Sequence, residues 1–447
     1  MKNLEHEKRI VTENTRLATF RNGLALCAAI AVATASLTAQ AAWTYDAEAK
    51  TLLDGNYSFP VKEVSIADPA SATGEKISGL EISGDATAGS GDLDFTSVET
   101  DTGYKVISIV YWDHANILTN VTDCTRFIAP DLMQLGRASF QDYTALTEIV
   151  VSDKLTEIPY RCLNGTTGLT KITPETFPYV TKVGQGALQG SSIEAISLPN
   201  VKQIDGYAFQ NFKGLVGDLS FPQLETAGDQ AFYGATKITS VSAPKLNQTA
   251  ASLFFECSEL TNLVLGAGCT ADGLKNKAYA NCPKLENITP APVIASVQTN
   301  PFVGETDTAY FKNNPFVMEG DAITELETCF MRQVPSLKSI EIRCDKLAKL
   351  GSYVFAAIAD GAEILWDGAA PTEVHEWAFN GNSDVRKKII LKQADSADGW
   401  KSLSNFKAVS DSDKNRADYP GKSTLGVING NVWLVKGWTS GLMILIR

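Results

Sequence analysis

Histidine is the side chain best suited to acid–base chemistry near neutral pH, and only two histidines follow the first 41 residues. His114 and His375 fall in different parts of the chain, and neither has a partner pattern typical of a nucleophilic centre. The sequence therefore does not support a Ser-His-Asp or Cys-His site.

Cysteines are more numerous but equally unpromising as reactive groups. Seven follow residue 41, an odd number with no C-x-x-C spacing: Cys124, Cys162, Cys257, Cys269, Cys282, Cys329 and Cys344. Zinc ribbons and thioredoxin-type redox centres have no support, and whether any of these cysteines pair is left open. Cys257 and Cys282 each follow an aromatic residue at a repeated position, and we expect them to be packed thiols.

Carboxylates at calcium-ligand spacing occur near the C-terminus. Asp411-x-Asp413-x-Asn415 begins like an EF-hand loop. Arg416 stands where that loop needs glycine, and Lys422 stands where it needs a bidentate glutamate, so a solvated loop is favoured.

A second acidic run, residues 89–94, resembles one turn of a calcium β-roll but occurs only once. No glycine-rich phosphate-binding motif or G-x-S-x-G elbow occurs in a supporting context. The sequence predicts no enzyme, no cofactor and no metal.

The strongest pattern is a repeat of Ala-Phe or a related dipeptide. It appears as Ser139-Phe140, Cys162-Leu163, Ala187-Leu188, Ala208-Phe209, Ala231-Phe232, Phe254-Phe255, Ala278-Tyr279, Cys329-Phe330, Val354-Phe355 and Ala378-Phe379. The steps between second residues are 23, 25, 21, 23, 23, 24, 51, 25 and 24. The step of 51 fits two units, the middle one degenerate around Pro290 to Glu319.

Each anchor is followed by L-x-x-I-x-L, which predicts a short strand with alternate residues facing inward. The pattern covers residues 146–151, 193–198, 238–243, 260–265 and 337–342. Pro199, Pro222 and Pro244 follow such strands, where proline removes no central ladder bond.

One unit of roughly 23 residues cannot bury its own apolar side, so about ten units must stack. The strands would form a parallel sheet, and the aromatic anchors would fill the interior from the opposite side, stacked about 4.8 Å apart. The sequence predicts one clear strand per coil, with turns or short helical pieces on the other side.

These residues resemble the BspA-like leucine-rich repeats of bacterial surface proteins. The unit L-x-x-I-x-L-P-x-(V/L)-x-x-I-x-x-x-A-F-x-(N/G) is clearest at Ile193 to Asn211 and Leu219 to Gly234. The resemblance covers roughly Asp123 to Gln393, and Leu163 and Leu188 depart from it by replacing the aromatic. It implies an extracellular leucine-rich-repeat solenoid used for adhesion or protein binding, without catalytic residues.

The candidate ligand-binding residues are the outward x positions of the strands, which are mostly small and polar and lack aromatic anchors. They are Glu148, Val150, Ala195, Ser197, Asp218, Ser220, Ser240, Ser242, Asn262, Val264, Ser339 and Glu341. A merely solvated face is the alternative.

The regions flanking the repeats differ from them. Residues 42–122 are predicted to form a β-rich N-terminal capping module, and residues 123–408 the solenoid. Residues 409–447 contain a hairpin pattern around Asn429-Gly430, which predicts either a C-terminal β-cap or a sorting segment.

Residues 1–41 combine a basic stretch, an apolar run and Ala39-Gln40-Ala41, which predicts a signal peptide cleaved near Ala41 and a secreted or cell-surface protein. An uncleaved anchor is the alternative. No other segment could cross a bilayer. The whole chain has a formal charge of −12, and this acidity gives no electrostatic case for binding nucleic acid or anionic lipid.

The sequence therefore favours an exported, non-catalytic protein that binds an extracellular protein or glycan. Two other hypotheses remain. A parallel β-helix enzyme acting on polysaccharides has coils of similar length, but no neighbouring coils place acids in register. A structural spacer on the envelope needs no ligand at all.

Overall fold

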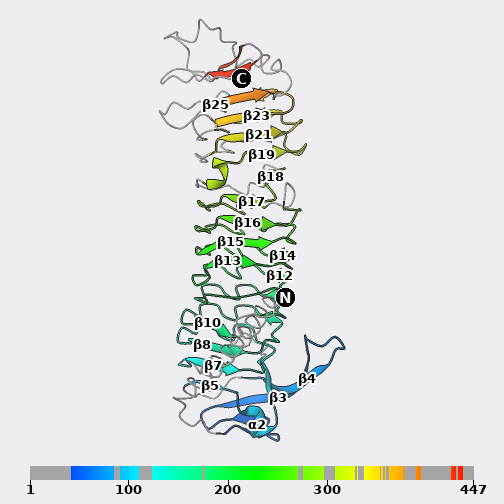
Figure 1. Cartoon of the computed structure of the whole chain (residues 1–447), viewed down its shortest axis with the longest axis vertical. Helices are drawn as coiled ribbons and strands as arrows, with labels where there is room; N and C mark the ends of the chain where they lie inside the picture. The colour runs from blue at the N-terminus through cyan, green and yellow to red at the C-terminus, as the bar shows by residue number, and fades with distance from the viewer. Residues whose placement is uncertain are drawn as a thin grey trace, which may run out of the picture.

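The computed structural model describes residues 42–84, 91–109, 123–173, 177–269, 275–295, 308–327, 330, 337–352, 354–355, 358, 362–375, 378, 389–393, 424–428 and 431–435. Over most of these residues the chain winds into an elongated stack of coils (Figure 1).

Some predictions concern residues outside these ranges. They are the signal peptide (1–41), His114, the EF-hand-like loop around Asp411, and Cys329.

Parallel strands of two to six residues form the first ladder of the solenoid, here called the wide ladder (Figure 1). One section contains β5 (Leu93–Asp94), β7 (Arg126–Ala129), β8 (Glu148–Val151) and β10 (Lys171–Thr173). The next contains β13 (Gly217–Ser220), β15 (Ile238–Ala243), β16 (Asn262–Leu265) and β17 (Asn287–Thr289). The last contains β18 (Val293–Ile294), β19 (Phe316–Glu319), β21 (Ser339–Arg343), β23 (Ala362–Trp366) and β25 (Ile389–Gln393).

The register of the wide ladder keeps equivalent residues aligned. Val241 pairs with Leu219 on one side and Leu263 on the other, and Leu263 pairs with Ile288. All four are buried, so the predicted inward positions form continuous apolar rows. The leucine-rich-repeat solenoid predicted from the period is confirmed.

One predicted strand is not formed. Residues 193–196 have no strand assignment, and only Ser197 makes a bridge. The connection from Leu188 to Ile193 is one residue shorter than the connection from Phe209 to Leu215, so this segment enters its layer out of register. The next coil has one extra residue, and Gly217, at φ 87°, accommodates it beside the register shift in β13.

The coils also form a second set of parallel strands, which the expectation of one strand per coil missed. This narrow ladder has two residues per strand: β9 (Glu157–Ile158), β11 (Lys182–Val183), β12 (Gln203–Ile204) and β14 (Thr226–Ala227). It reappears as β20 (Glu325–Leu326), β22 (Lys349–Leu350) and β24 (Glu373–Val374). Two residues are too few for a periodic pattern, which explains why the sequence did not reveal these strands.

The aromatic anchors stack inside the solenoid as predicted. The ring centroids of Phe209 and Phe232 lie 5.2 Å apart with planes 3° from parallel. Those of Phe232 and Phe254 lie 5.4 Å apart. Backbone hydrogen bonds join these turns, from Phe209 N to Ala231 O and from Phe232 N to Leu253 O. Leu253-Phe254 is therefore the true equivalent of Ala231-Phe232, and the assignment of Phe254-Phe255 to that position was wrong by one residue.

Two backbone positions flank each anchor from Phe140 to Tyr279 in the left-handed region, two residues before it and two after. Asp142, Asn211 and Glu256 occupy the later position at φ 61°, 52° and 61°, and Gly234 occupies it at 65°. This conformation explains the N/G preference at the end of the repeat unit.

The coil predicted to be degenerate is irregular in the structure. β17 and β18 belong to one extended stretch that Pro290 and Pro292 interrupt, because neither proline can donate a backbone hydrogen bond. β17 pairs with β16 below it, and β18 pairs with β19 above it. A 3-10 helix, η2 (Ala309–Lys312), precedes β19, and its buried Tyr310 and Phe311 fill the core there.

The N-terminal residues form a small sheet at the base of the stack (Figure 1). Its strands are β1 (Thr44–Asp46), β2 (Thr51–Leu53), β3 (Ser58–Ala67), β4 (Lys76–Ile82) and β6 (Val106–Ile109), with helix α2 (Val98–Thr102) before β6. Ring contacts run from Trp43 to Phe95, from Phe95 to Phe127 and from Phe127 to Phe140. The core of this sheet is thus continuous with the core of the solenoid.

Near the C-terminus, β26 (Thr424–Ile428) and β27 (Asn431–Val435) pair as an antiparallel hairpin, as the Asn-Gly pattern predicted. The backbone of β27 lies against β25, the last strand of the wide ladder.

Candidate binding surface

The twelve candidate residues all lie outside the core, on what is here called the wide face of the solenoid. None is buried: Ala195, Asp218, Ser220, Asn262 and Val264 are exposed, and the other seven are half-buried. Their neighbours at the inward positions are buried, except Ile196 in the unformed strand. The structure brings ten of the twelve together in ladder strands, and Ala195 and Ser197 lie in the unformed strand. Whether they bind a ligand stays a prediction.

In the middle of the wide face, polar side chains bridge neighbouring coils. The Asp218 carboxylate accepts hydrogen bonds from Ser240 Oγ at 2.6 Å and from Thr239 Oγ1 at 2.7 Å. These two bonds favour the charged form and lower the pKa of Asp218. The carboxylate is therefore held in a fixed position by the next strand.

The same face continues through an amide pair and ends in charged pairs. Asn287 Nδ2 donates to Asn262 Oδ1 at 2.7 Å. Towards the N-terminus, Arg126 Nε lies 3.2 Å from Glu148 Oε2. Towards the C-terminus, Arg343 pairs with both Glu341 and Glu319. The face thus offers ordered rows of short polar groups between two charged stretches, a surface suited to contact with an extended partner.

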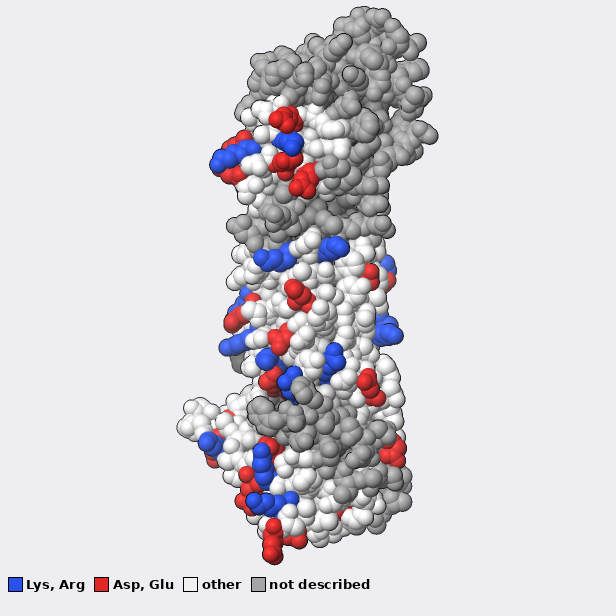
Figure 2. All heavy atoms as spheres, turned by 180° about the vertical axis from the view of Figure 1, so that it is seen from behind, with Lys and Arg blue, Asp and Glu red and all other residues white. Residues whose placement is uncertain are grey.

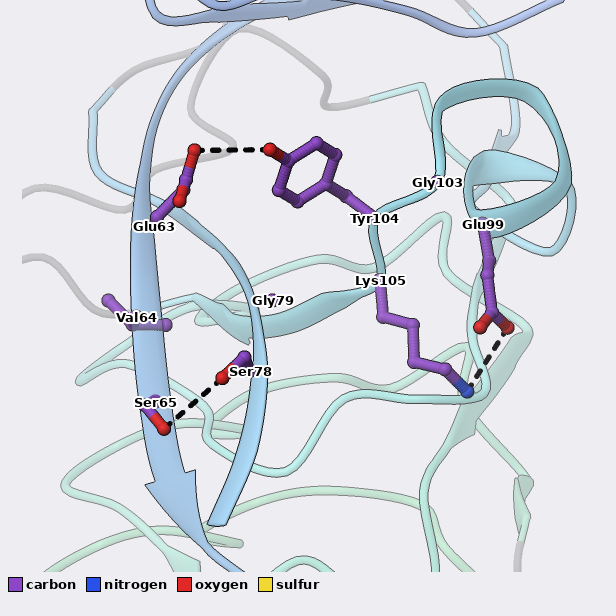
Figure 3. A pocket seen from close by; sticks show the side chains of 9 residues that line it. All are labelled: Glu63, Val64, Ser65, Ser78, Gly79, Glu99, Gly103, Tyr104 and Lys105. Carbon is purple, nitrogen blue, oxygen red and sulfur yellow. Dashed lines mark hydrogen bonds and ion pairs between the residues drawn. The ribbon is translucent and has the colours of Figure 1, made fainter.

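The two clefts described by the structure lie away from the wide face. One, of about 490 Å³, lies beside β14 and is lined by residues that include Glu225, Asp229 and Lys275. The other, of about 480 Å³, lies in the N-terminal sheet between β3, β4 and the segment after α2 (Figure 3). Sequence reasoning missed both, because each is assembled from segments far apart in the chain.

The narrow ladder carries charges in register, but they form ion pairs. Lys182 Nζ lies 3.1 Å from Glu157 and 3.8 Å from Asp205, and Lys349 Nζ lies 2.7 Å from Glu325. Seen from the side opposite to Figure 1, acidic and basic side chains are interspersed on the described surface (Figure 2). A cluster of carboxylates such as polysaccharide hydrolysis uses is not formed by these groups.

The described cysteines are buried free thiols, and Cys257 and Cys282 pack as predicted. The thiol of Cys257 contacts Phe232 O at 3.1 Å, and that of Cys282 contacts Phe254 O at 2.9 Å. Burial raises the pKa of Cys282 to about 12, which disfavours the reactive thiolate. Among the described residues no group of three or more His, Cys, Asp or Glu side chains could hold a metal ion.

Helices contribute little to the described part of the chain, and none of them has the length and apolar character of a membrane span.

Comparison with known proteins identifies the repeat. A model of the BspA-type leucine-rich repeat region matches six copies, over residues 105–216 and 181–309. The resemblance inferred from the Ala-Phe anchors is confirmed. No curated protein matches the chain.

Several solved structures are similar. A pneumococcal vaccine antigen, PcpA, is 15% identical, with 80% of this chain and 96% of that chain covered and a TM-score of 0.39. A leucine-rich repeat protein from Bacteroides ovatus is 16% identical, with 59% and 83% covered and a TM-score of 0.22. A leucine-rich repeat protein from T. pallidum is 16% identical, with 48% and 77% covered and a TM-score of 0.25.

Proposed function

We propose that this protein, which carries a BspA-type leucine-rich repeat region over residues 105–309, is an exported, non-catalytic surface or secreted protein that binds an extracellular protein or glycan through its wide face. The observation that carries the proposal is the arrangement of the wide face. Short polar side chains from successive coils stand in register there, and Asp218 and Asn262 are hydrogen-bonded across strands. A rigid, repetitive surface of this kind loses little entropy on binding.

The flanking modules have a structural part in this proposal. Terminal coils expose an apolar face that must be covered. The N-terminal module continues the core through Trp43 and Phe95, and the β26–β27 hairpin lies against β25 at the other end. We propose that both modules cap the solenoid.

The export part of the proposal rests on residues 1–41, whose composition is typical of a signal peptide. Labelling of intact cells and of culture medium tests it directly. The protein is expected in one of these two fractions, and its confinement to the cell interior would contradict export.

The binding part is tested with the purified chain on arrays of extracellular matrix proteins and glycans, alongside a screen for glycan and ester hydrolysis. Saturable binding to at least one array member, without turnover, is expected. Turnover of a glycan or an ester would favour the enzyme hypothesis, and an absence of any binding would favour an envelope spacer.

A further inference from the structure

Glu63 and Tyr104 line the cleft in the N-terminal sheet, and Tyr45 packs against Tyr104 beside it. Tyr45 comes from β1, Glu63 from the middle of β3, and Tyr104 from the turn between α2 and β6. The two tyrosine rings meet edge to face with centroids 4.9 Å apart. Tyr104 points across the cleft towards Glu63 (Figure 3). Three segments that are distant in sequence thus converge on one exposed carboxylate.

The two tyrosines orient this carboxylate. Tyr45 and Tyr104 both donate their hydroxyl protons to the same oxygen, Glu63 Oε1, at 3.4 and 3.3 Å. The negative charge of Glu63 in turn raises the pKa of the Tyr104 hydroxyl, so the hydroxyl remains a donor. No hydrogen bond among the described residues reaches Oε2, which is therefore available to a ligand.

The one lysine of the cleft does not neutralise Glu63. Lys105 Nζ lies 2.8 Å from Asp131 Oδ1 and 3.1 Å from Glu99 Oε2, so its charge is already shared by two carboxylates (Figure 3). None of the ion pairs between described residues includes Glu63. The cleft therefore carries an excess of negative charge next to two aromatic rings.

We propose that this cleft binds a cationic side chain, arginine or lysine, from a basic segment of a partner protein. A cation at Oε2 would pair with the Glu63 charge beside the two tyrosine hydroxyls that hold Oε1. The hydroxyls of Ser65 on β3 and Ser78 on β4, 3.3 Å apart, line the same cleft and are placed to bond the peptide backbone of that segment. The charge of Glu63, which Lys105 does not neutralise, would repel an anionic ligand. This site is separate from the wide face and does not rest on it.

The test uses a fluorescein-labelled hexapeptide with two arginines and the same peptide with citrulline, which keeps the shape but loses the charge. The arginine peptide is expected to bind the purified chain with an affinity that falls as salt rises. Glu63→Gln should weaken it about fivefold. Tyr104→Phe should weaken it about twofold, because the ring remains and only the orienting hydroxyl is lost.

The control is Glu157→Gln, which removes a half-buried carboxylate from the solenoid and should leave the peptide affinity unchanged. Equal binding of the citrulline peptide, unchanged binding in Glu63→Gln, or an equal loss in Glu157→Gln would each overturn the proposal. A glycan outcome would also overturn it. If an N-acetylglucosamine oligomer binds the chain without competing with either peptide, and Tyr104→Ala abolishes that binding, the cleft is a glycan site.

Discussion

At the scale of single residues, Phe254 and Phe255 show how neighbouring identical side chains can have unequal roles. Phe254 is 1% exposed and stacks on Phe232 in the core. Phe255 is half-buried and stacks on Tyr233 at the surface, with Lys277 Nζ 5.9 Å above its ring. Of these two residues, only Phe254 therefore takes part in the stack of aromatic anchors in the core.

Phe254→Ala is expected to lower the free energy of unfolding by about 3–5 kcal/mol, because it leaves a cavity between two packed coils. Phe255→Ala should cost about 1 kcal/mol, the worth of an exposed aromatic contact. Urea denaturation followed by circular dichroism measures both. A larger loss of unfolding free energy in Phe255→Ala than in Phe254→Ala would instead support the register inferred from sequence spacing, in which Phe255 is the anchor.

The sequence could place an aromatic at this point of the repeat but could not choose between the two. Both residues fit a spacing near 23, since coil lengths vary by more than one residue. The backbone decides the register: Phe232 N bonds to Leu253 O, and Ser252 and Glu256 take the left-handed positions. Neither property is visible in a pattern of apolar residues.

Gly234 and Gly190 test the left-handed position after the anchor. Their φ values are 65° and 68°, but a Cβ at Gly234 would lie 2.5 Å from Asn211 Oδ1, and one at Gly190 would have open space. Gly190→Ala should cost about 1 kcal/mol from the backbone alone, and Gly234→Ala somewhat more, because the Asn211 side chain must move away from the new Cβ. Thermal denaturation measures the stability of both variants. Equal losses of stability would show that contact between coils does not restrict the residue type at this position.

At the scale of elements, the end of the β3–β4 hairpin projects beside the solenoid (Figure 1), and an ion pair joins it to the solenoid. Asp68, next to the end of β3, lies 2.6 Å from Nζ of Lys154 in the turn after β8. The hydrogen bond from Lys154 lowers the pKa of Asp68, and Asp68 raises the pKa of Lys154. The pair therefore positions the hairpin at neutral pH.

Because the folded pKa of Asp68 is lowered, the pair stabilises the docked hairpin above the usual carboxyl pKa of about 3.9. This contribution is lost as the pH falls through the lowered value. Carbon NMR of aspartate carboxyls should show that the titration midpoint of Asp68 lies below the usual carboxyl value. Lys154→Met should raise this midpoint towards the usual value. Lys346→Met, which removes a surface lysine paired with Asp321, should leave Asp68 unchanged. An Asp68 midpoint indifferent to Lys154→Met would contradict this docking.

The elements differ in how well sequence predicts them. The wide ladder follows from L-x-x-I-x-L, because alternation over six residues leaves a pattern. The narrow ladder does not, since Lys182 and Val183 form a strand through pairing with the two-residue strands of the neighbouring coils, β9 on one side and β12 on the other. Pairing between coils, not local propensity, creates such short strands.

At the scale of the whole molecule, the orientation of the candidate site could be predicted but its surroundings could not. All twelve outward positions lie outside the core, and for the ten in ladder strands this follows from the side-chain period of two. The clefts required the tertiary arrangement: Glu63 and Tyr104 are 41 residues apart and meet only through the N-terminal sheet. A surface formed by stacked coils can therefore be predicted from the repeat pattern, whereas a cleft formed by segments distant in the sequence cannot.

The wide face as contact surface is the central claim, and paired arginine substitutions test it most directly. Ser242 and Val264 are neighbours on the wide face, and Gln203 and Thr226 are neighbours on the narrow ladder. Ser242→Arg with Val264→Arg should weaken binding to the array ligand at least about tenfold, since bulk and charge at the centre of an interface exclude the partner. Gln203→Arg with Thr226→Arg should leave it unchanged. Full binding by the first variant, or an equal loss in both, would contradict the claim.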